Sequence, residues 1–339
     1  MKNKKLIDLI ILFFVLLSTS SVFAQSHSNG KLADKPLFRD PVYDGAADPT
    51  LIWNRKAKKW FMFYTNRRAN AKDTSGVTWV HGTRIGIAES SDGGATWTYK
   101  DTANINYRPD SGYTFWAPEV VEYHGLYHMF LSYVPGVFED WNHPRQIIHL
   151  TSIDLLNWKY VSALKLASNK VIDACVIQMP NGNWRMWYNN ELDGKSIYFA
   201  DSPDLFHWRD RGKAIGDRRG EGPNVFLWKG KYWMVVDQWA GLGVYQSNDL
   251  LHWLPQPVRI LERPGTGPED GTKGGHPYVI VNGDRAFVFY FLHPGRTPDN
   301  ESVDNSETRR SLIQVAELHE TNGITSCDRD EPVYINLQH

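Results

Sequence analysis

The sequence predicts an all-β protein, a five-bladed β-propeller whose blades are four-stranded and antiparallel. Three recurring patterns support this prediction: strands that open with a polar or acidic residue, aromatic-rich strands that follow them, and turns in which Asp precedes Trp. The patterns succeed one another in a constant order about every 45 to 70 residues. Repeats of this length that hold four strands each are typical of propeller blades.

Each blade is expected to begin with an inner strand, and these strands start near Asp48, Glu119, Asp173, Glu221 and His276. The aromatic-rich second strands are predicted at 59–64, 126–131, 183–188, 231–236 and 285–290. Turns with Asp and Trp follow at 92–97, 154–158, 204–208 and 249–253. In such a turn the Asp side chain accepts backbone N–H bonds, while the Trp ring covers the adjacent sheet.

The innermost strands of a propeller line its central axis, so the residues that open them ring one end of a funnel. Asp48, Asp173 and Glu221 are therefore expected to meet in one pocket, although they are far apart in the sequence. The C-terminal segment 332–337 is expected to form one last strand that packs beside 37–43 and helps to close the ring.

The N-terminal residues indicate export. Three lysines within the first five residues precede the apolar stretch 6–17, and small residues end at Ala24. This is the pattern of a signal peptide, residues 1–24, cleaved after Ala24. We expect a secreted or periplasmic protein whose residues 25–339 form a single propeller domain.

Composition narrows the functional classes. With 42% hydrophobic and 22% charged residues, the chain supports a folded core. A formal charge of -1 without a basic tract argues against nucleic-acid binding. No later stretch is long and apolar enough to predict membrane insertion. Cys175 and Cys327 permit one disulfide, and the sequence leaves both this pairing and the oligomeric state open.

Four short motifs, in their order along the chain, resemble glycoside hydrolase family 43. They are Ala-Asp-Pro around Asp48, Trp-Ala-Pro before Glu119, Ile-Asp at Asp173 and Glu-Gly-Pro from Glu221. The resemblance covers 48–318 and implies a five-bladed arabinanase, arabinofuranosidase or xylosidase. It implies that Asp48 is the general base, that Glu221 is the general acid, and that Asp173 tunes and orients the acid.

The same resemblance implies further contacts with an oligosaccharide or polysaccharide. Trp116 matches an aromatic residue that stacks on the terminal sugar, and Glu119 is a candidate for the rim. Arg309 or Arg310 matches a late arginine that contacts the tuning aspartate and the sugar. His276 matches a histidine beneath the catalytic floor that helps to hold a water or a calcium ion. No cofactor is required, and calcium bound to His276 through water is left open.

The carboxylates suit inverting hydrolysis, in which the acid and the base lie ~6.5–9.5 Å apart so that a water fits beside the sugar. A nearby Asp173 charge is expected to keep the proton on Glu221. The long loops 67–82 and 298–307 are expected to close one side of the funnel. The sequence therefore predicts an inverting exo-glycosidase that removes terminal sugars from polysaccharide side chains. The predicted sugar is α-L-arabinofuranosyl, or else β-xylosyl or β-galactofuranosyl.

Two alternatives remain at this stage. A non-catalytic carbohydrate-binding propeller would use the ring of carboxylates only to bind sugar. A glycoside phosphorylase would need a basic phosphate pocket near the acids, for which Arg218 and Arg219 are candidates.

Overall fold

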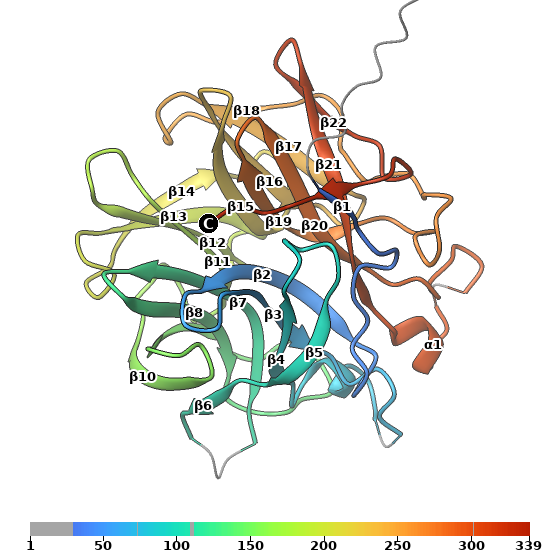
Figure 1. Ribbon diagram of the computed structural model, residues 1–339. Coiled ribbons are helices and arrows are strands. Elements are labelled where there is room, and N and C mark those ends of the chain that lie inside the picture. Colours follow the sequence, from blue (N-terminus) through green and yellow to red (C-terminus); the bar gives the residue numbers. More distant parts are fainter. Residues whose placement is uncertain (1–29, 73, 109–111, 301) are drawn as a thin grey trace, which may run out of the picture.

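The computed structural model describes residues 30–72, 74–108, 112–300 and 302–339, and it confirms the five-bladed propeller (Figure 1). The expected signal peptide, residues 1–24, lies outside the described residues. Among the residues that are described, no helix is long and apolar enough to cross a membrane.

The five blades follow one another along the chain, and each contains strands that are consecutive in sequence. Blade one contains β2 (Ala46–Asn54), β3 (Lys59–Asn66), β4 (Arg84–Ser90) and β5 (Thr98–Thr102). Blade two contains β7 (Thr114–Tyr123), β8 (Leu126–Val134), β9 (Gln146–Ser152) and β10 (Asn157–Ala163), with β6 (Asn104–Asn106) parallel to β10 as a fifth strand. Blade three contains β11 (Val171–Gln178), β12 (Trp184–Asn190), β13 (Ser196–Ser202) and β14 (Arg209–Ile215). Blade four contains β15 (Glu221–Trp228), β16 (Lys231–Asp237), β17 (Leu242–Ser247) and β18 (Leu254–Pro255), and blade five contains β19 (Gly275–Asn282), β20 (Arg285–Leu292), β21 (Leu312–Thr321) and β22 (Ile324–Cys327). Outside the blades lie β1 (Lys31–Leu32), β23 (Tyr334–Ile335), the short helix α1 (Ser306–Arg309) and a 3-10 turn at Thr78–Val80.

The turns with Asp and Trp have the structural role that the sequence predicts. In blades one to four a serine two residues before the Asp donates its hydroxyl to the carboxylate, at 2.9 to 3.2 Å. The same carboxylates accept backbone N–H bonds from the following residues. These aspartates therefore close turns at the outside of the blades and are not candidates for chemistry.

All five inner strands carry an irregularity at an equivalent position. The pairing register shifts there, and the residue at the shift has a positive φ: Asp48 (53°), Ala117 (45°), Asp173 (61°), Gly222 (55°) and His276 (35°). For a residue other than glycine this backbone conformation costs about 1–2 kcal/mol. A bulge of this kind re-aims a side chain, and strain repeated at one end of a fold points to a functional site.

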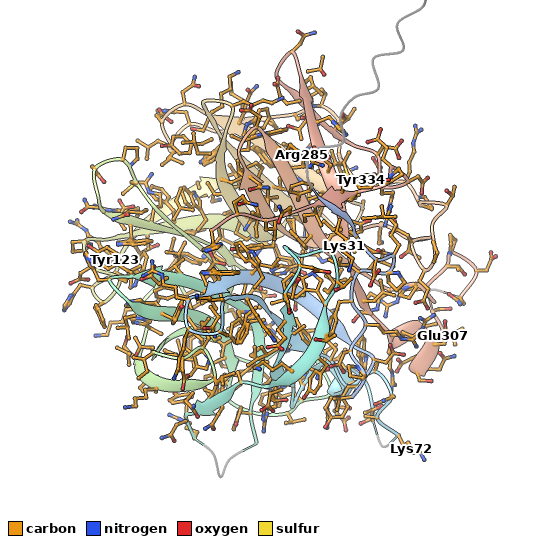
Figure 2. All side chains as sticks on the ribbon, in the orientation of Figure 1. Lys31, Lys72, Tyr123, Arg285, Glu307 and Tyr334 are labelled. Carbon is orange, nitrogen blue, oxygen red and sulfur yellow. The ribbon has the colours of Figure 1, made fainter. Side chains whose placement is uncertain are left out.

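The ring is closed between blade five and blade one. Strand β1 pairs antiparallel with β23, so Lys31 and Tyr334 belong to the same small sheet (Figure 2). The expected packing of 332–337 beside 37–43 is confirmed, because Leu37 and Phe38 share one buried cluster with Val333, Ile335 and Leu337. The strand that hydrogen-bonds to β23 is β1, residues 31–32. Phe38 instead bridges to Ile313 in blade five.

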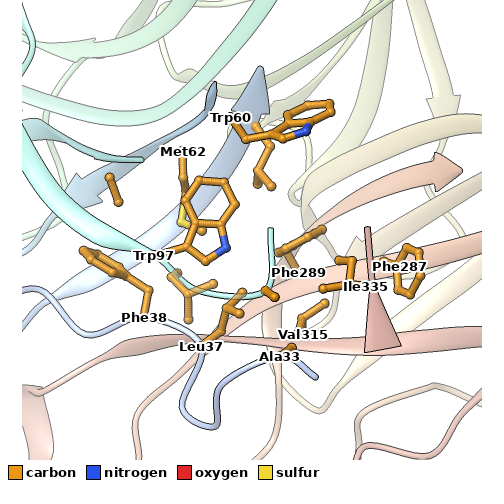
Figure 3. Close-up of a cluster of buried hydrophobic side chains, with 14 of the residues drawn as sticks. Ala33, Leu37, Phe38, Trp60, Met62, Trp97, Phe287, Phe289, Val315 and Ile335 are labelled. Carbon is orange, nitrogen blue, oxygen red and sulfur yellow. The ribbon is translucent and has the colours of Figure 1, made fainter. Parts of the chain in front are cut away.

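A hydrophobic cluster fills this seam (Figure 3). Trp60 and Trp97 of blade one lie close to Phe287 and Phe289 of blade five, with Ile335 of β23 beside them. Full burial of a large apolar side chain stabilises the fold by about 1.5–3 kcal/mol. Side-chain packing between blades one and five therefore closes the ring, and neither of these blades takes a strand from the other. Cys175 and Cys327 are both free thiols, so no disulfide adds to it.

Candidate active site

A cavity of about 890 Å³ lies at the end of the propeller where the inner strands carry their bulges. Each blade contributes to its lining: Asp48 from blade one, Trp116 from two, Asp173 from three, Glu221 from four and His276 from five. The structure thus brings together all three predicted catalytic carboxylates. Blades two and four contribute the residue immediately before the bulge, whereas the other blades contribute the bulge residue itself.

Asp48 is buried beside two basic groups. The Arg67 guanidinium donates to its carboxylate at 3.0 Å, and His276 Nδ1 lies 3.5 Å away. Burial alone would raise the pKa of Asp48, but Arg67, His276 and a hydrogen bond from Thr65 outweigh it and lower the pKa below its usual value. Asp48 is therefore held ionised, which is the state a general base requires.

Asp173 is equally buried but lies in the opposite electrostatic environment. Its Oδ2 accepts the Gly222 N–H at 3.0 Å, and its own backbone N–H donates to Ser132 Oγ at 3.0 Å. Burial, together with the negative charges of Glu221 and Asp48, raises the pKa of Asp173 well above its usual value. Because Gly222 follows Glu221, the bond to Asp173 also fixes the backbone next to the expected acid.

Glu221 is more exposed than the two aspartates, with 24% of its side chain accessible. Its Oε2 accepts from Lys195 Nζ at 2.9 Å, and its Oε1 accepts from the indole N–H of Trp239 at 3.1 Å. Lys195 also donates to Glu191 at 3.0 Å. An ammonium group thus contacts Glu221, whereas Asp173 lies deeper, between the charges of Glu221 and Asp48.

Asp237 is a buried carboxylate of this site that the sequence analysis did not single out. It pairs with Glu221 across the β15–β16 hairpin. Its two oxygens accept the backbone N–H groups of Trp239 at 2.7 Å and His276 at 2.9 Å. Burial and the Glu221 charge raise the pKa of Asp237 to about 6. Asp237 therefore ties together the two loops that carry the indole beside Glu221 and the imidazole beside Asp48.

Aromatic side chains form one wall of the cavity. Trp116 lines it, and the indole N–H of this residue donates to the Val80 carbonyl at 2.6 Å. The Trp141 ring lies 6.0 Å from it, and the Trp141 side chain is about half exposed. A flat apolar surface of this kind suits the face of a sugar ring.

Glu119 does not line the cavity. It lies two residues beyond Ala117, deeper along the axis, where its carboxylate accepts from the Val176 N–H at 2.8 Å and from the Thr50 hydroxyl at 3.3 Å. Burial raises the pKa of Glu119 to about 8 against these two hydrogen bonds. The expected rim position is thus wrong. Pro49 and Pro118 both directly follow a bulge residue. Aligning blades one and two on these prolines would have shown that Ala117, and not Glu119, is the equivalent of Asp48.

The two late arginines also lie outside the cavity lining. Arg309 pairs with Asp304 and donates to Thr74, and Arg310 pairs with Glu307 and Glu269. Neither contacts Asp173. Two basic residues that the sequence analysis did not assign, Arg67 and Lys195, contact the expected base and acid instead. Their only sequence signal is a position shortly after an aromatic strand, which many structural residues share.

The residues around His276 do not by themselves form a calcium site. His276 Nδ1 lies 3.5 Å from Asp48 and 4.0 Å from Asp173, both of which already accept other hydrogen bonds. In the described part of the chain, no group of three acidic, histidine or cysteine side chains is placed to hold a metal ion. Calcium prefers six to eight oxygen ligands. We therefore assign no catalytic step to calcium.

No protein-family model matches this sequence, and no curated protein matches it. Solved structures do match its fold. A thermostable family-43 glycoside hydrolase superposes with a TM-score of 0.66 at 19% identity, over 89% of this chain and all of the other. A family-43 β-1,3-galactosidase with galactodeoxynojirimycin gives 0.61 at 13%, over 88% of this chain and 97% of the other.

A family-43 β-xylosidase/α-arabinofuranosidase from a compost microbial metagenome, in complex with xylotriose, gives a TM-score of 0.58 at 14% identity, over 86% of this chain and 94% of the other. The chain shares its fold with family-43 glycoside hydrolases. The resemblance in the sequence motifs and the likeness in structure thus point to the same fold.

Proposed function

We propose that the protein is an exported, inverting exo-glycoside hydrolase. The terminal sugar that it removes is α-L-arabinofuranosyl, with β-xylosyl and β-galactofuranosyl as the alternatives. One observation carries this proposal: Asp48 and Glu221 line a single cavity from blades one and four, in environments of different charge. Export rests on the N-terminal sequence pattern, and the choice of arabinofuranosyl or xylosyl is supported by the activities named for one solved relative.

Asp48 is the base in this mechanism. Arg67 and His276 stabilise its negative charge, so it takes a proton from a water that attacks the anomeric carbon. Hydrolysis with inversion requires this water to approach from the face opposite the leaving group. Blades one and four are not neighbours in the ring, which leaves space for sugar and water between the two carboxylates.

Glu221 is the acid that protonates the leaving oxygen, and Asp173 tunes and orients it. The Asp173 carboxyl accepts the Gly222 N–H at 3.0 Å and so fixes the backbone next to Glu221. The charge of Glu221 is one cause of the raised pKa of Asp173, so the two carboxyl groups interact electrostatically. Lys195 contacts Glu221 and has a second carboxylate partner, Glu191, at 3.0 Å. It can therefore move from Glu221 towards Glu191 when the sugar enters.

Loops from three blades are joined to one another beside the cavity, which they line with Trp79, Trp141 and Thr297. Arg309 of blade five donates to Thr74 of blade one, and Ser75 of blade one donates to Glu139 of blade two at 2.6 Å. The Val77 N–H also donates to the Glu139 carbonyl at 3.0 Å. A pocket with one closed side accepts the end of a chain rather than its middle, which supports exo action.

The charge distribution disfavours the phosphorylase alternative. In an inverting phosphorylase, phosphate replaces the attacking water and must bind on the side of the base. Two cations line the cavity on that side, Arg67 and Arg296. Arg67 is already paired with Asp48, and the charge of Arg296 already acts on Asp304, whose pKa it helps to lower. Arg219 lies on the side of Glu221 instead, because its guanidinium carbon is 5.6 Å from the ring centroid of Trp239.

Kinetics with two kinds of leaving group test the roles of the two carboxylates. Nitrophenyl pentosides and hexofuranosides leave readily, whereas a sugar leaving group needs protonation. We expect Glu221→Gln to lose about 10²–10⁴-fold in turnover of disaccharides but much less with nitrophenyl glycosides, and Asp48→Asn to lose activity on both. Asp193→Asn, at an exposed carboxylate paired with Lys213, is the matched control and is expected to keep full activity.

Proton NMR of the first sugar formed tests the stereochemistry, and inversion is the expected result. A retained anomeric configuration would overturn the mechanism. Binding of sugars without turnover of any glycoside, unchanged in Glu221→Gln, would establish the non-catalytic propeller instead.

A further inference from the structure

Two cations of the cavity lack an acidic partner. Arg67 pairs with Asp48, Lys195 pairs with Glu191 and Glu221, and Arg145 pairs with Glu191. Arg219 and Lys273 also line the cavity and are exposed, yet neither forms a hydrogen bond or an ion pair with any residue that the structure describes. A site built only for neutral sugars has no need of two such charges.

Arg219 has a defined place relative to the expected acid. It stands two residues before Glu221, and its guanidinium lies against Trp239, whose indole N–H donates to Glu221 at 3.1 Å. The distance from the guanidinium carbon to the ring centroid, 5.6 Å, is within the range of cation–π pairs. The backbone N–H of Trp239 is in turn bound by Asp237, so the ring itself is anchored.

Lys273 reaches the cavity from the neighbouring blade. The Gly274 N–H donates to the Leu261 carbonyl at 3.0 Å, and Gly275 packs directly against the Asp237 carboxylate. This chain segment therefore borders the same wall as Asp237 and Trp239. Glu262 also lines this wall, and its carboxylate is paired with Arg259 at 3.3 Å.

We propose that Arg219, together with Lys273, binds an anionic group, a carboxylate or a sulfate ester, on the sugar that leaves. This inference rests on the proposed function, because the acid protonates the leaving oxygen and residues beside Glu221 therefore face the leaving sugar. A guanidinium matches the paired oxygens of a carboxylate or sulfate, and bonds between charged partners are the strong ones. The natural substrate is then an acidic polysaccharide whose uronic acid or sulfated sugar carries the terminal residue that is removed.

Binding of matched oligosaccharides to the Asp48→Asn chain tests the proposal without turnover. The carboxylate ligands are acidic oligosaccharides from pectin and from glucuronoxylan, each compared with the same material after its carboxyl groups are reduced to alcohols. The sulfate ligands are sulfated galactan oligosaccharides, compared with their desulfated forms. We expect one acidic series to bind about tenfold tighter than its neutral counterpart, and the preference to weaken as NaCl is raised. The series that shows the preference identifies the anionic group.

Arg219→Gln combined with Lys273→Gln is expected to abolish this preference and to leave binding of the neutral ligands unchanged. Arg218→Gln is the matched control, because Arg218 is adjacent in sequence but lies outside the cavity lining, 4.0 Å from Asp217. Equal affinity for acidic and neutral ligands in both series, or loss of the preference in Arg218→Gln as well, would overturn the proposal. Failure of the proposed function gives a different result: Arg219-dependent binding of acidic ligands with no hydrolysis by the unmodified protein.

Discussion

Replacement of Glu119 by glutamine is expected to make the stability of the protein less dependent on pH. The Glu119 carboxyl is buried on the propeller axis and has a pKa of about 8 instead of its ordinary 4.5. A raised pKa means that the folded state holds this proton more tightly than the unfolded chain does. The folded state is therefore favoured most below the unfolded pKa, and this stability is lost as the pH rises towards the folded pKa.

The two pKa values give the size of the effect. From about pH 5 upwards the unfolded chain has mostly released the proton of Glu119, because its pKa is 4.5, whereas the folded protein keeps the proton until the pH nears 8. This difference lowers the free energy of unfolding of the unmodified protein by about 3 kcal/mol across that range. Glutamine preserves the shape and the bond from Val176, and its amide can donate to Thr50. From about pH 5 to about pH 8, the free energy of unfolding of Glu119→Gln should therefore rise by about 3 kcal/mol relative to that of the parent.

Urea unfolding followed by tryptophan fluorescence at the two pH values measures this gain. Glu122→Gln is the control on the same strand, because its carboxylate pairs with Arg55 near the surface and such pairs contribute less than about 1 kcal/mol. Turnover of Glu119→Gln should stay within about twofold of the parent, since the residue lies outside the cavity lining. The same difference in unfolding free energy between variant and parent at both pH values would refute this reasoning. A large loss of turnover would indicate that Glu119 acts on the substrate.

Three further predictions concern the neighbours of the three carboxylates. Arg67→Gln removes the cation that helps to lower the pKa of Asp48, so the acidic limb of the profile of kcat/KM against pH should move to higher pH. Arg67→Lys should restore part of this shift. An acidic limb that does not move in Arg67→Gln would exclude Arg67 from this role. Asp237→Asn replaces one of the two acceptor oxygens by an amide group, whose N–H then faces the backbone N–H of Trp239 or His276. Turnover should fall about 10- to 100-fold, with a smaller change in KM. A change in thermal stability alone would mean that Asp237 has a purely structural role. Gly222→Ala places a methyl group 2.8 Å from His276 Nδ1 at a φ of 55°, whereas the methyl group of Gly283→Ala meets open space at a φ of 64°. Both variants should lose about 1 kcal/mol of stability, but only Gly222→Ala should lose turnover. Equal activity of the two variants would contradict the proposed position of His276.

The sequence predicted those residues of the site that stand at the repeating position near the start of each inner strand. Asp48, Asp173 and His276 are bulge residues of inner strands, and Glu221 directly precedes one, so a correct count of blades was enough to bring them to one cavity. Glu119 failed because blade two was matched by charge rather than by its proline. A shift of two residues along an inner strand moves a side chain deeper along the axis, which is how a candidate for the rim became a buried carboxyl.

Only the tertiary structure decided which charges the three carboxylates meet. Arg67, Lys195 and Asp237 reach the site from strand ends and loops, where no period constrains the sequence, and the distances that set the ionisation of Asp48 and Asp173 depend on how neighbouring blades pack. The amino-acid sequence by itself determined the number of blades and the end of the propeller at which acids gather, because strand and turn patterns are local. The division of those acids into one held ionised and one held protonated is a property of contacts between blades, and contacts of that range become visible only in the folded chain.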